Sequence, residues 1–425
     1  MDVDSTFEIV GEFGPYQKRI YFLLCLMPFM TSFHTLLSSF ILATPDHRCA
    51  LPNWPNDTYK IQSEAHREDV NRSIPLSSED GYLYDGCTIY GNSSELVNCE
   101  KWVYAKTVFE STFTSEQNFV CDDELKTSHA AMIFFCGVLT GALGFGSLSD
   151  LLIPESPRWL LSQGKHEEAV KILKKIAKGN NRNVDEKAFG NLTVQEEPAG
   201  RFWHLIDNPV LFKRTLIILI NWMFASMAYY GLSLNTGDLS GDYYLNFFLS
   251  GLAEFPAYTI CLLLLDRIGR KTLHVSCMVF GGIFCICAIF PMLYASEDLQ
   301  PITVTLAMLG KVGIAAAYGI IYVWSAELYP TVVRNQGMGL SSTMANTGAL
   351  VSPYVADLNK AVSGHVGRAL PFVLFGGCAL LAGLLALMLP ETLNQHLPET
   401  IEDGINFGKK PNNKYKSEFC KFSWR

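Results

Sequence analysis

Charged residues are scarce in this sequence, and its net charge is not positive. Only 17% of its 425 residues are Asp, Glu, Lys or Arg, whereas 49% are hydrophobic; soluble globular domains carry about 25% charged residues. The formal net charge is −8, and residues 43–128 account for all of it with 15 acidic and 7 basic side chains. So little charge predicts a surface that faces lipid, and without a basic surface nucleic acid is not an expected partner.

Catalytic motifs are also missing. The nine histidines form no HExxH pair, and neither a GxSxG elbow nor a GxxxxGK[ST] loop occurs. The glycines of residues 141–146 lie inside an apolar run, where they favour close helix packing. We therefore expect no enzymatic activity, no cofactor and no metal site, and we interpret the cysteines outside residues 43–128 as small core residues.

Long apolar runs are what the sequence has in abundance. A bilayer crossing needs about 20 residues. The first run is too long for a signal peptide, and no small-residue cleavage site follows it before Pro45. The eight runs of crossing length are 20–42, 129–149, 214–234, 243–265, 272–294, 302–325, 337–356 and 369–389.

Flanking charges predict the orientation, since basic residues stay on the cytosolic side. If residues 1–19 are cytosolic, the loop 43–128 (hereafter the acidic loop) lies outside, and 150–213 and the tail 390–425 lie inside. The basic residues then inside are Arg267, Arg270, Lys271, Arg334, Lys409, Lys410, Lys414 and Lys416, and the acidic ones outside are Asp238, Asp242, Glu297 and Asp298. We therefore expect a multi-pass protein with both termini cytosolic.

The acidic loop carries two further signs of an oxidising, secretory compartment. Its three Asn-x-Ser/Thr sequons predict glycosylation, and its even number of cysteines predicts disulfides with three possible pairings. A fourth sequon, at Asn191, lies on the predicted cytosolic side and is expected to stay unmodified. The sequon residues are Asn56, Asn71 and Asn92, and the cysteines are Cys49, Cys87, Cys99 and Cys121.

Short motifs at the predicted cytosolic helix ends carry a family resemblance. Residues 146–150 (GSLSD) and 266–271 (DRIGRK) resemble the two short-loop motifs of the major facilitator superfamily. Residues 154–161 (PESPRWLL) and 326–335 (AELYPTVVRN) resemble the organic cation, anion and carnitine transporter family, the solute carrier family 22 type. The resemblance covers nearly the whole chain.

The resemblance implies an all-α polytopic fold of the major facilitator type. It also implies transport of small organic cations or zwitterions such as carnitine, by alternating access, at the plasma membrane; a coupling ion stays open. In this family the short-loop residues clamp helix ends in one state of the cycle. The residues implied in that role are Asp150, Asp266, Arg267, Arg270, Lys271, Glu327 and Arg334.

Part of the family pattern is missing. Family members continue the first motif with Arg-x-Gly-Arg and then helices three to six, but here three residues separate Asp150 from Pro154. This predicts an incomplete, two-helix first half (20–149) and an intact six-helix second half (214–389). The alternative to a working transporter is a transport-inactive truncated product, which arises from splicing or from a gene model. Without its first half, the polar cavity face of the second half would face lipid, at a cost of several kcal/mol for each unsatisfied polar group. Such a product is expected to oligomerise or to bind a full-length relative.

Four residues of the second half are candidates for substrate binding. Trp222 and Tyr229 are seven apart, hence on one helix face, and the resemblance places them on the cavity wall, where aromatic rings bind cations. The alternatives are an interfacial belt for Trp222 and packing for Tyr229. Glu254 within a span indicates either a functional site or a structural pair with a neighbouring helix. Lys311 either counters a substrate carboxylate or snorkels to the interface.

Asn346 is the fifth candidate. It lies in the least apolar run, 337–356, whose polar residues at helical spacing predict a face toward a water-filled cavity. The resemblance aligns it with a position that is Asp in cation-selective members and Arg in anion- or carnitine-handling members. A neutral amide selects no charge, so the charge class of the substrate stays open. Glu254 favours a cation or zwitterion, and so do the tail residues 389–392 and 397–401, which resemble the carnitine and organic-cation branch of the family. Asn346 could equally bind a neighbouring helix.

Residues 165–178 predict an amphipathic helix with lysines on one side. It either lies on the anionic inner leaflet or packs against helix ends. Residues 179–200 predict a flexible linker.

Overall fold

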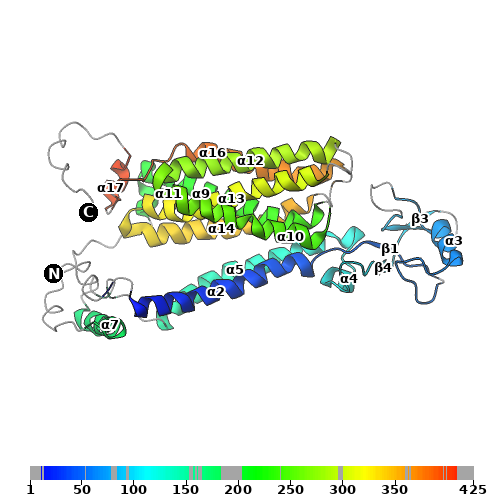
Figure 1. Ribbon diagram of the computed structural model, residues 1–425, viewed down its shortest axis with the longest axis horizontal. Helices are drawn as coiled ribbons and strands as arrows, with labels where there is room; N and C mark the ends of the chain where they lie inside the picture. Colours follow the sequence, from blue (N-terminus) through cyan, green and yellow to red (C-terminus); the bar gives the residue numbers. More distant parts are fainter. Residues whose placement is uncertain are drawn as a thin grey trace. The chain divides into compact units, whose positions relative to one another are not determined.

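The computed structural model describes residues 11, 14–52, 54–77, 84–91, 95–152, 157, 160, 165–182, 203–239, 241–294, 300–358, 362, 365–395, 397–398 and 400–408. The chain forms two compact units, Met1–Pro198 (unit 1) and Ala199–Arg425 (unit 2). Figure 1 shows long helices in both units.

Unit 1 contains two long helices, α2 (Pro15–Ile41) and α5 (Leu125–Leu152). Proline suits the first position of α2. A backbone N–H at this position has no acceptor within the helix, so proline, which lacks the N–H, loses no hydrogen bond. With 1.5 Å rise per residue, the 27 residues of α2 extend about 40 Å, more than the roughly 30 Å of a hydrocarbon core. Its apolar side chains are largely exposed, from Ile20 to Ile41, as expected for a helix surrounded by lipid.

The acidic loop folds into short elements that the sequence did not predict. Its strands pair antiparallel, with His47 opposite Tyr104 in one pair and Thr88 opposite Asn98 in the other. The elements are β1 (His47–Cys49), α3 (Glu64–Ser73), β2 (Thr88–Tyr90), β3 (Leu96–Asn98), β4 (Trp102–Tyr104), α4 (Phe113–Gln117) and η1 (Cys121–Asp123).

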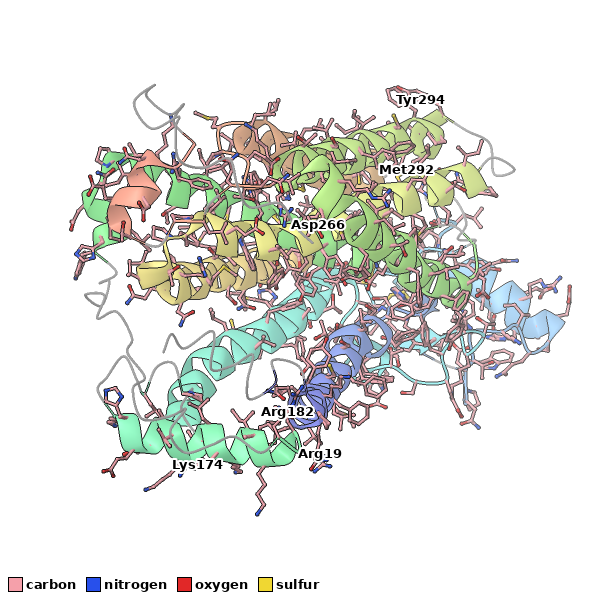
Figure 2. The ribbon with its side chains drawn as sticks, turned by 60° about the vertical axis from the view of Figure 1, so that its left-hand side comes forward. Arg19, Lys174, Arg182, Asp266, Met292 and Tyr294 are labelled. Atoms are coloured by element: carbon pink, nitrogen blue, oxygen red, sulfur yellow. A yellow bond between two sulfur atoms is a disulfide. The ribbon has the colours of Figure 1, made fainter. Side chains whose placement is uncertain are left out.

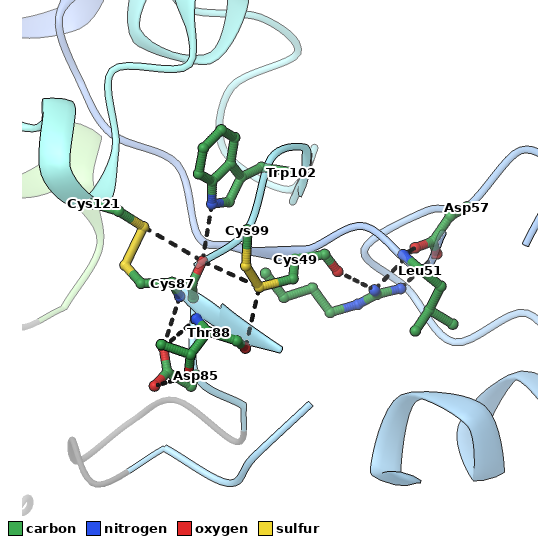
Figure 3. The surroundings of a disulfide bond; sticks show 11 residues. Cys49, Leu51, Asp57, Asp85, Cys87, Thr88, Cys99, Trp102 and Cys121 are labelled. Atoms are coloured by element: carbon green, nitrogen blue, oxygen red, sulfur yellow. Dashed lines mark hydrogen bonds and ion pairs between the residues drawn. A yellow bond between two sulfur atoms is a disulfide. The ribbon is translucent and has the colours of Figure 1, made fainter. Parts of the chain in front are cut away.

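Two disulfides cross-link the acidic loop. Of the three pairings left open, the structure has Cys49–Cys99 and Cys87–Cys121, drawn in Figure 3. His47 lies close to the second pair, but sulfurs already joined to each other are not the thiolates that a metal would need. The loop also has its own apolar centre, formed by Cys49, Leu51, Val70 and Ile74.

A buried ion pair supports the same loop. Arg48 donates two hydrogen bonds to the Asp57 carboxylate, at 2.6 and 3.0 Å, and their side chains are only 1% and 5% exposed. The backbone N–H of Leu51 also donates to Asp57. His66 lies 3.0 Å from the same carboxylate through Nε2, while its Nδ1 accepts from the Gln62 N–H.

The predicted amphipathic helix is α7 (His166–Gly179). Its apolar side is buried, with Leu173 and Ile176 packed together with Leu160 and the ring of Tyr16. The structure therefore shows packing on neighbouring segments for this apolar side. Most of the predicted linker lies outside the described residues.

Unit 2 is a helical bundle with its own core. The predicted span 243–265 is two helices rather than one, because the chain leaves the helix at Ala253. The elements are α8 (His204–Asp207), α9 (Pro209–Leu234), η3 (Asn235–Asp238), α10 (Tyr243–Leu252), α11 (Glu254–Ile268), α12 (Arg270–Tyr294), α13 (Gln300–Leu328), η5 (Thr331–Val333), α14 (Arg334–Ala356), α16 (His365–Ala386) and α17 (Ile401–Asn406). Helix α12 packs on α13 and α16, and α9 packs on α14 and α16.

Small residues bring these helices close. A Cβ added at Gly313 would lie 2.7 Å from the backbone of α12 at Cys277, and one at Gly348 would clash with the Met223 carbonyl of α9. Both helix pairs therefore depend on glycine, as is usual between membrane helices.

Six helical stretches among the described residues are long and apolar enough to cross a membrane: 15–41, 209–237, 243–268, 270–294, 300–328 and 366–386. Helices α5 and α14 coincide with the remaining two predicted spans. Helix α14 is the run whose polar residues stood out in the sequence. The chain is thus a multi-pass, predominantly helical protein.

Helix α17 is an addition that hydropathy did not predict. Arg214 of α9 donates 2.6 Å hydrogen bonds to the carbonyls of Gly404 and Phe407. Gly404 also packs on Pro330. These contacts fix the start of the tail to the bundle.

Candidate functional site

Three helices bring a carboxylate and a group of tyrosines together in unit 2. The Tyr229 hydroxyl of α9 donates to Glu254 Oε1 at 2.6 Å. The Tyr229 ring stacks on Tyr318 of α13, with centroids 5.2 Å apart and planes at 24°. Glu254 begins α11, directly after the break between α10 and α11, and its side chain is 29% exposed. The break thus presents a reachable carboxylate beside aromatic faces.

Lys311 of α13 lies next to this carboxylate. Its ammonium is 4.0 Å from Glu254 Oε1 and donates to the Ser250 hydroxyl of α10. It also lies 5.8 Å from the centroid of the Tyr229 ring. With its side chain 5% exposed, Lys311 is buried in protein and does not snorkel to the surface. One ammonium therefore neutralises part of the charge of Glu254.

Trp222 lies about two turns before Tyr229 on α9 and is closed off. It is 1% exposed, and its indole N–H donates to the Ser325 hydroxyl at 2.8 Å. Its ring contacts Tyr322 edge to face at 4.3 Å and Tyr318 at 6.3 Å. In this conformation Trp222 supports the tyrosines of α13 rather than lining an open wall.

Asn346 is only loosely connected to this group. Its amide donates to the Ser342 carbonyl one turn earlier in α14. The preceding residue, Ala345, accepts a hydrogen bond from Ser226 of α9, so Asn346 follows the contact between α9 and α14. The structure brings Trp222, Tyr229, Glu254 and Lys311 together through their side chains, and places Asn346 on the neighbouring helix.

Sequence reasoning missed two members of the cluster, Tyr318 and Tyr322. Their hydroxyls are 3.3 Å apart, and their rings join Trp222 to Tyr229. The available signal was their spacing of four residues, which puts them on one face of α13. That spacing alone did not identify them, because α13 is apolar over most of its length and hydropathy does not tell which face is inside.

A second cluster clamps the ends of α11, α12 and α13. The Arg270 guanidinium binds Glu327 at 3.1 Å and Asp266 at 3.0 Å, and Asp266 is labelled in Figure 2. The Thr392 hydroxyl, from the segment after α16, donates to Glu327 as well. Arg270 is mostly buried and Asp266 is 80% exposed, so Glu327 is its stronger partner.

Glu391 caps the start of α12 in the same cluster. Its two carboxylate oxygens accept the backbone N–H groups of Arg270 and Lys271 at 2.9 and 3.1 Å. A negative charge here also complements the helix dipole. The preceding Gly269 has φ +102°, and a Cβ there would lie 2.5 Å from the Glu391 carboxylate, so glycine is required by conformation and by space.

Known proteins are similar to this chain in sequence over most of its length. The family model described as "Sugar (and other) transporter" matches residues 106–403. The organic cation transporter protein of Drosophila melanogaster is 32% identical, over 97% of this chain and 96% of that protein. The chain belongs to the solute carrier family 22 type of major facilitator transporters. It is therefore a membrane transporter and not an enzyme.

Two further likenesses complete the comparison. Organic cation/carnitine transporter 2 of Homo sapiens is 28% identical to this transporter, over 94% of this chain and 93% of that protein. The solved proton:xylose symporter XylE is similar over 59% of this chain and 54% of its own, with 17% identity and a TM-score of 0.41, a likeness too slight to carry an argument.

The remaining short-loop residues of the transporter are less tightly held. Arg334 donates to the Tyr329 carbonyl and the Thr331 hydroxyl. Arg267 is exposed, and Lys271 is half-buried. The backbone of Asp150 belongs to α5, but its side chain lies outside the described residues.

The sequons occupy different settings. Asn56 and Asn71 are exposed, and Asn71 accepts a hydrogen bond from the Tyr84 hydroxyl at 2.6 Å. Asn92 lies outside the described residues.

Proposed function

We propose that this transporter carries small organic cations or zwitterions such as carnitine across the plasma membrane by alternating access. The observation that supports this most strongly is the Glu254 carboxylate beside the stacked rings of Tyr229 and Tyr318. Aromatic faces and a carboxylate are the groups that attract an organic ammonium ion. The printed names of the relatives, organic cation transporter and organic cation/carnitine transporter, agree with this chemistry.

Lys311 fits a role in handling charge at this site. Its ammonium lies 4.0 Å from the Glu254 carboxylate, and a substrate cation that binds Glu254 would replace Lys311 as its charge partner. A zwitterion brings a cation for Glu254 and a carboxylate for Lys311, and both protein charges then remain paired. Asn346 contributes a neutral amide that can hydrogen-bond either kind of substrate.

The proposed orientation has both termini in the cytosol. Disulfides and sequons in the acidic loop suit the outer side, and the basic residues from Arg267 to Lys271 suit the inner side. The proposed organisation is a cytosolic N-terminus (1–19), two membrane helices flanking the acidic loop (20–149), a cytosolic loop (150–213), a six-helix half (214–389) and a cytosolic tail (390–425).

Alternating access gives the second cluster its role. In this orientation Arg270, Glu327 and Thr392 hold the cytosolic ends of α12, α13 and the tail together. Any state that separates these ends must break the charge-assisted hydrogen bonds of Arg270, each contributing about 1.5–3 kcal/mol. We propose that this cluster sets the balance between the two access states.

A second candidate is a transport-inactive truncated product. The alignment with the Drosophila melanogaster relative runs over 538 residues, although this chain has 425. Because nearly all of both proteins is aligned, that relative has an internal segment with no counterpart here. The proximity of Asp150 to Pro154 supports a loss of helices three to six at that point, which leaves a two-helix partner for the six-helix half to move against.

Uptake measurements separate the two candidates. Cells expressing a tagged form of this chain are compared with cells expressing a version in which helices three to six of a relative are inserted between Asp150 and Pro154. Radiolabelled tetraethylammonium and carnitine are supplied, and uptake is normalised to surface biotinylation. Saturable uptake by the short chain establishes transport by two plus six helices. Uptake by the restored version alone supports the truncated product, and uptake by neither refutes the proposed substrate class.

A further inference from the structure

One side of helix α7 carries four exposed lysines. Lys171, Lys174, Lys175 and Lys178 are all exposed, and their spacing of three, four and seven residues puts them on one face. The opposite face, with Ala169, Leu173, Ile176 and Ala177, is buried. The helix is thus divided into a packed apolar side and an exposed side, on which these four lysines outnumber the two exposed glutamates of the first turn, Glu167 and Glu168.

Asn180, directly after α7, fixes this helix to the start of α2. Its side-chain oxygen accepts the Tyr16 N–H at 2.9 Å, and its amide donates to the Gly11 carbonyl at 3.2 Å and the Gln17 side chain at 2.9 Å. Asn180 is itself buried, at 8% exposure. Gly179 packs so closely on the Tyr16 ring that an added Cβ would lie 2.6 Å from it. The end of α7 is therefore held at the first turn of α2.

This attachment puts α7 at one end of a candidate membrane span. Helix α2 is long and apolar enough to cross a membrane, and α7 is held at its first residues. Lys18 and Arg19 are exposed on its next residues, and Arg182 is exposed just after α7. Figure 2 shows Arg19, Lys174 and Arg182 at the same end of unit 1. The lysines of α7 thus lie near the end of the span that the proposed orientation puts on the cytosolic side.

We propose that this cationic face, formed by Lys171, Lys174, Lys175, Lys178 and Arg182, docks on the anionic phospholipid headgroups of the cytosolic leaflet. Charge complementarity supports this occupant, because clustered lysines next to a membrane span attract anionic lipid. The apolar side of α7 is already filled by protein, so the contact is electrostatic and at the surface, without insertion. The proposal rests on the orientation given above.

Lipid binding to the full chain in detergent tests this directly. Phosphatidylserine or phosphatidylcholine is titrated into the purified protein, and bound lipid is counted by native mass spectrometry. The chain is expected to bind phosphatidylserine at least about tenfold more tightly than phosphatidylcholine. K171Q/K174Q/K175Q/K178Q should lose that preference, and K171R/K174R/K175R/K178R should keep it, since arginine retains the charge.

The matched control is K60Q/K101Q/K106Q/K126Q, which removes four exposed lysines of the acidic loop and should leave the preference unchanged. Preference retained by the α7 glutamine variant, or lost equally in the control, overturns the proposal. Competition by soluble glycerophosphoserine at the same concentration as the lipid would assign the face to free phosphate instead and also overturn it. This binding assay requires neither transport nor a defined orientation, so its result is independent of the uptake experiment.

Discussion

Two neighbours set the surroundings of Glu254 in the transporter's candidate site. Its carboxylate accepts a hydrogen bond from the Tyr229 hydroxyl and lies 4.0 Å from the Lys311 ammonium. At 29% exposure it is neither fully paired nor fully solvated. A carboxylate in that position can exchange one cation partner for another, which is what binding and release of a cation require.

Replacing Glu254 by Gln tests that role, in whichever form of the transporter takes up substrate. E254Q keeps the shape and removes the charge, so the KM for tetraethylammonium should rise at least about tenfold, equivalent to about 1.4 kcal/mol. Y229F keeps the ring and removes one charge-assisted hydrogen bond, so a smaller rise is expected. The measurement is initial uptake rate against substrate concentration. An unchanged KM in E254Q would remove Glu254 from the substrate site.

Asp57 in the acidic loop gives a prediction on pH. Burial raises the pKa of this carboxyl, but hydrogen bonds from Arg48 and the Leu51 N–H and the positive charge of Arg48 outweigh burial, so the net pKa lies below its usual value. A lowered folded-state pKa stabilises the fold at every pH above the unfolded value of about 3.9. The stabilisation is lost as the pH falls through the folded value.

D57N should therefore loosen the loop at neutral pH. It leaves Arg48 buried without its counter-charge, which costs about 3–5 kcal/mol, and it keeps the Asn56 sequon. The measurement is the rate at which a phosphine reductant opens Cys49–Cys99, which should rise at pH 7 and approach the wild-type rate below about pH 4. The exposed carboxylate variant D69N is the control. A difference that grows as the pH falls would contradict the assigned cause.

At the scale of elements, the turn between α11 and α12 is set by one glycine. Gly269 has a backbone conformation that residues with a side chain rarely adopt, and the carboxylate of Glu391 fills the space beside it. The short-loop motif thus needs glycine for geometry, in addition to its charges. Loss of the glycine would displace the cap and, with it, the start of α12.

G269A should lower the free energy of unfolding of the purified protein by about 1–3 kcal/mol, and with it the unfolding temperature. The matched control is G251A, because Gly251 lies in helix α10 and a Cβ there meets nothing within 4 Å. That change should be neutral or slightly stabilising, since alanine favours the helix. Tryptophan fluorescence during heating reports both. Equal stability of the two variants would show that the Gly269 conformation is not needed.

The sequence predicted the long elements well and the short ones poorly. Apolar runs located α9, α12, α13 and α16, because lipid imposes length and hydropathy on such helices. The break at Ala253 was not predicted because the apolar run continues on both sides of it, although Glu254 and Pro256 follow it. The strands of the acidic loop escaped because three residues are too few for an alternating pattern, and α17 because its stability comes from Arg214.

Site prediction had a similar limit. Glu254 and Lys311 stood out because charge inside a span is expensive. Their proximity did not follow from the sequence, since it depends on the α10–α11 break and on the packing of α11 against α13. Trp222 was expected on a cavity wall, and burial under Tyr318 and Tyr322 could only be seen once the helices were packed.

At the scale of the whole molecule, α14 is the least apolar of the described helices that are long enough to cross a membrane. It carries Ser342, Thr343 and Asn346 with partial or full exposure, and each polar group that lipid leaves without a partner is costly. In a complete transporter two six-helix halves face each other across a central site. We expect the short chain to cover this face with another protein.

The short chain should therefore purify as an oligomer, or with a full-length relative when the two are co-expressed. The restored version should purify as a monomer, because its own first half covers α14. Size-exclusion chromatography with light scattering, in the same detergent, measures both masses. A monomeric, well-folded short chain would show that lipid or detergent suffices to cover α14.

The acidic loop has a practical consequence for detection. Its apolar centre, its buried ion pair and its two cross-links are all contained within residues 47–121, and none of them depends on lipid. An antibody raised against the oxidised loop should recognise the native protein on intact cells and lose its epitope on reduction. Such a reagent would report surface arrival of the short and restored chains alike, because both display the same immunogen.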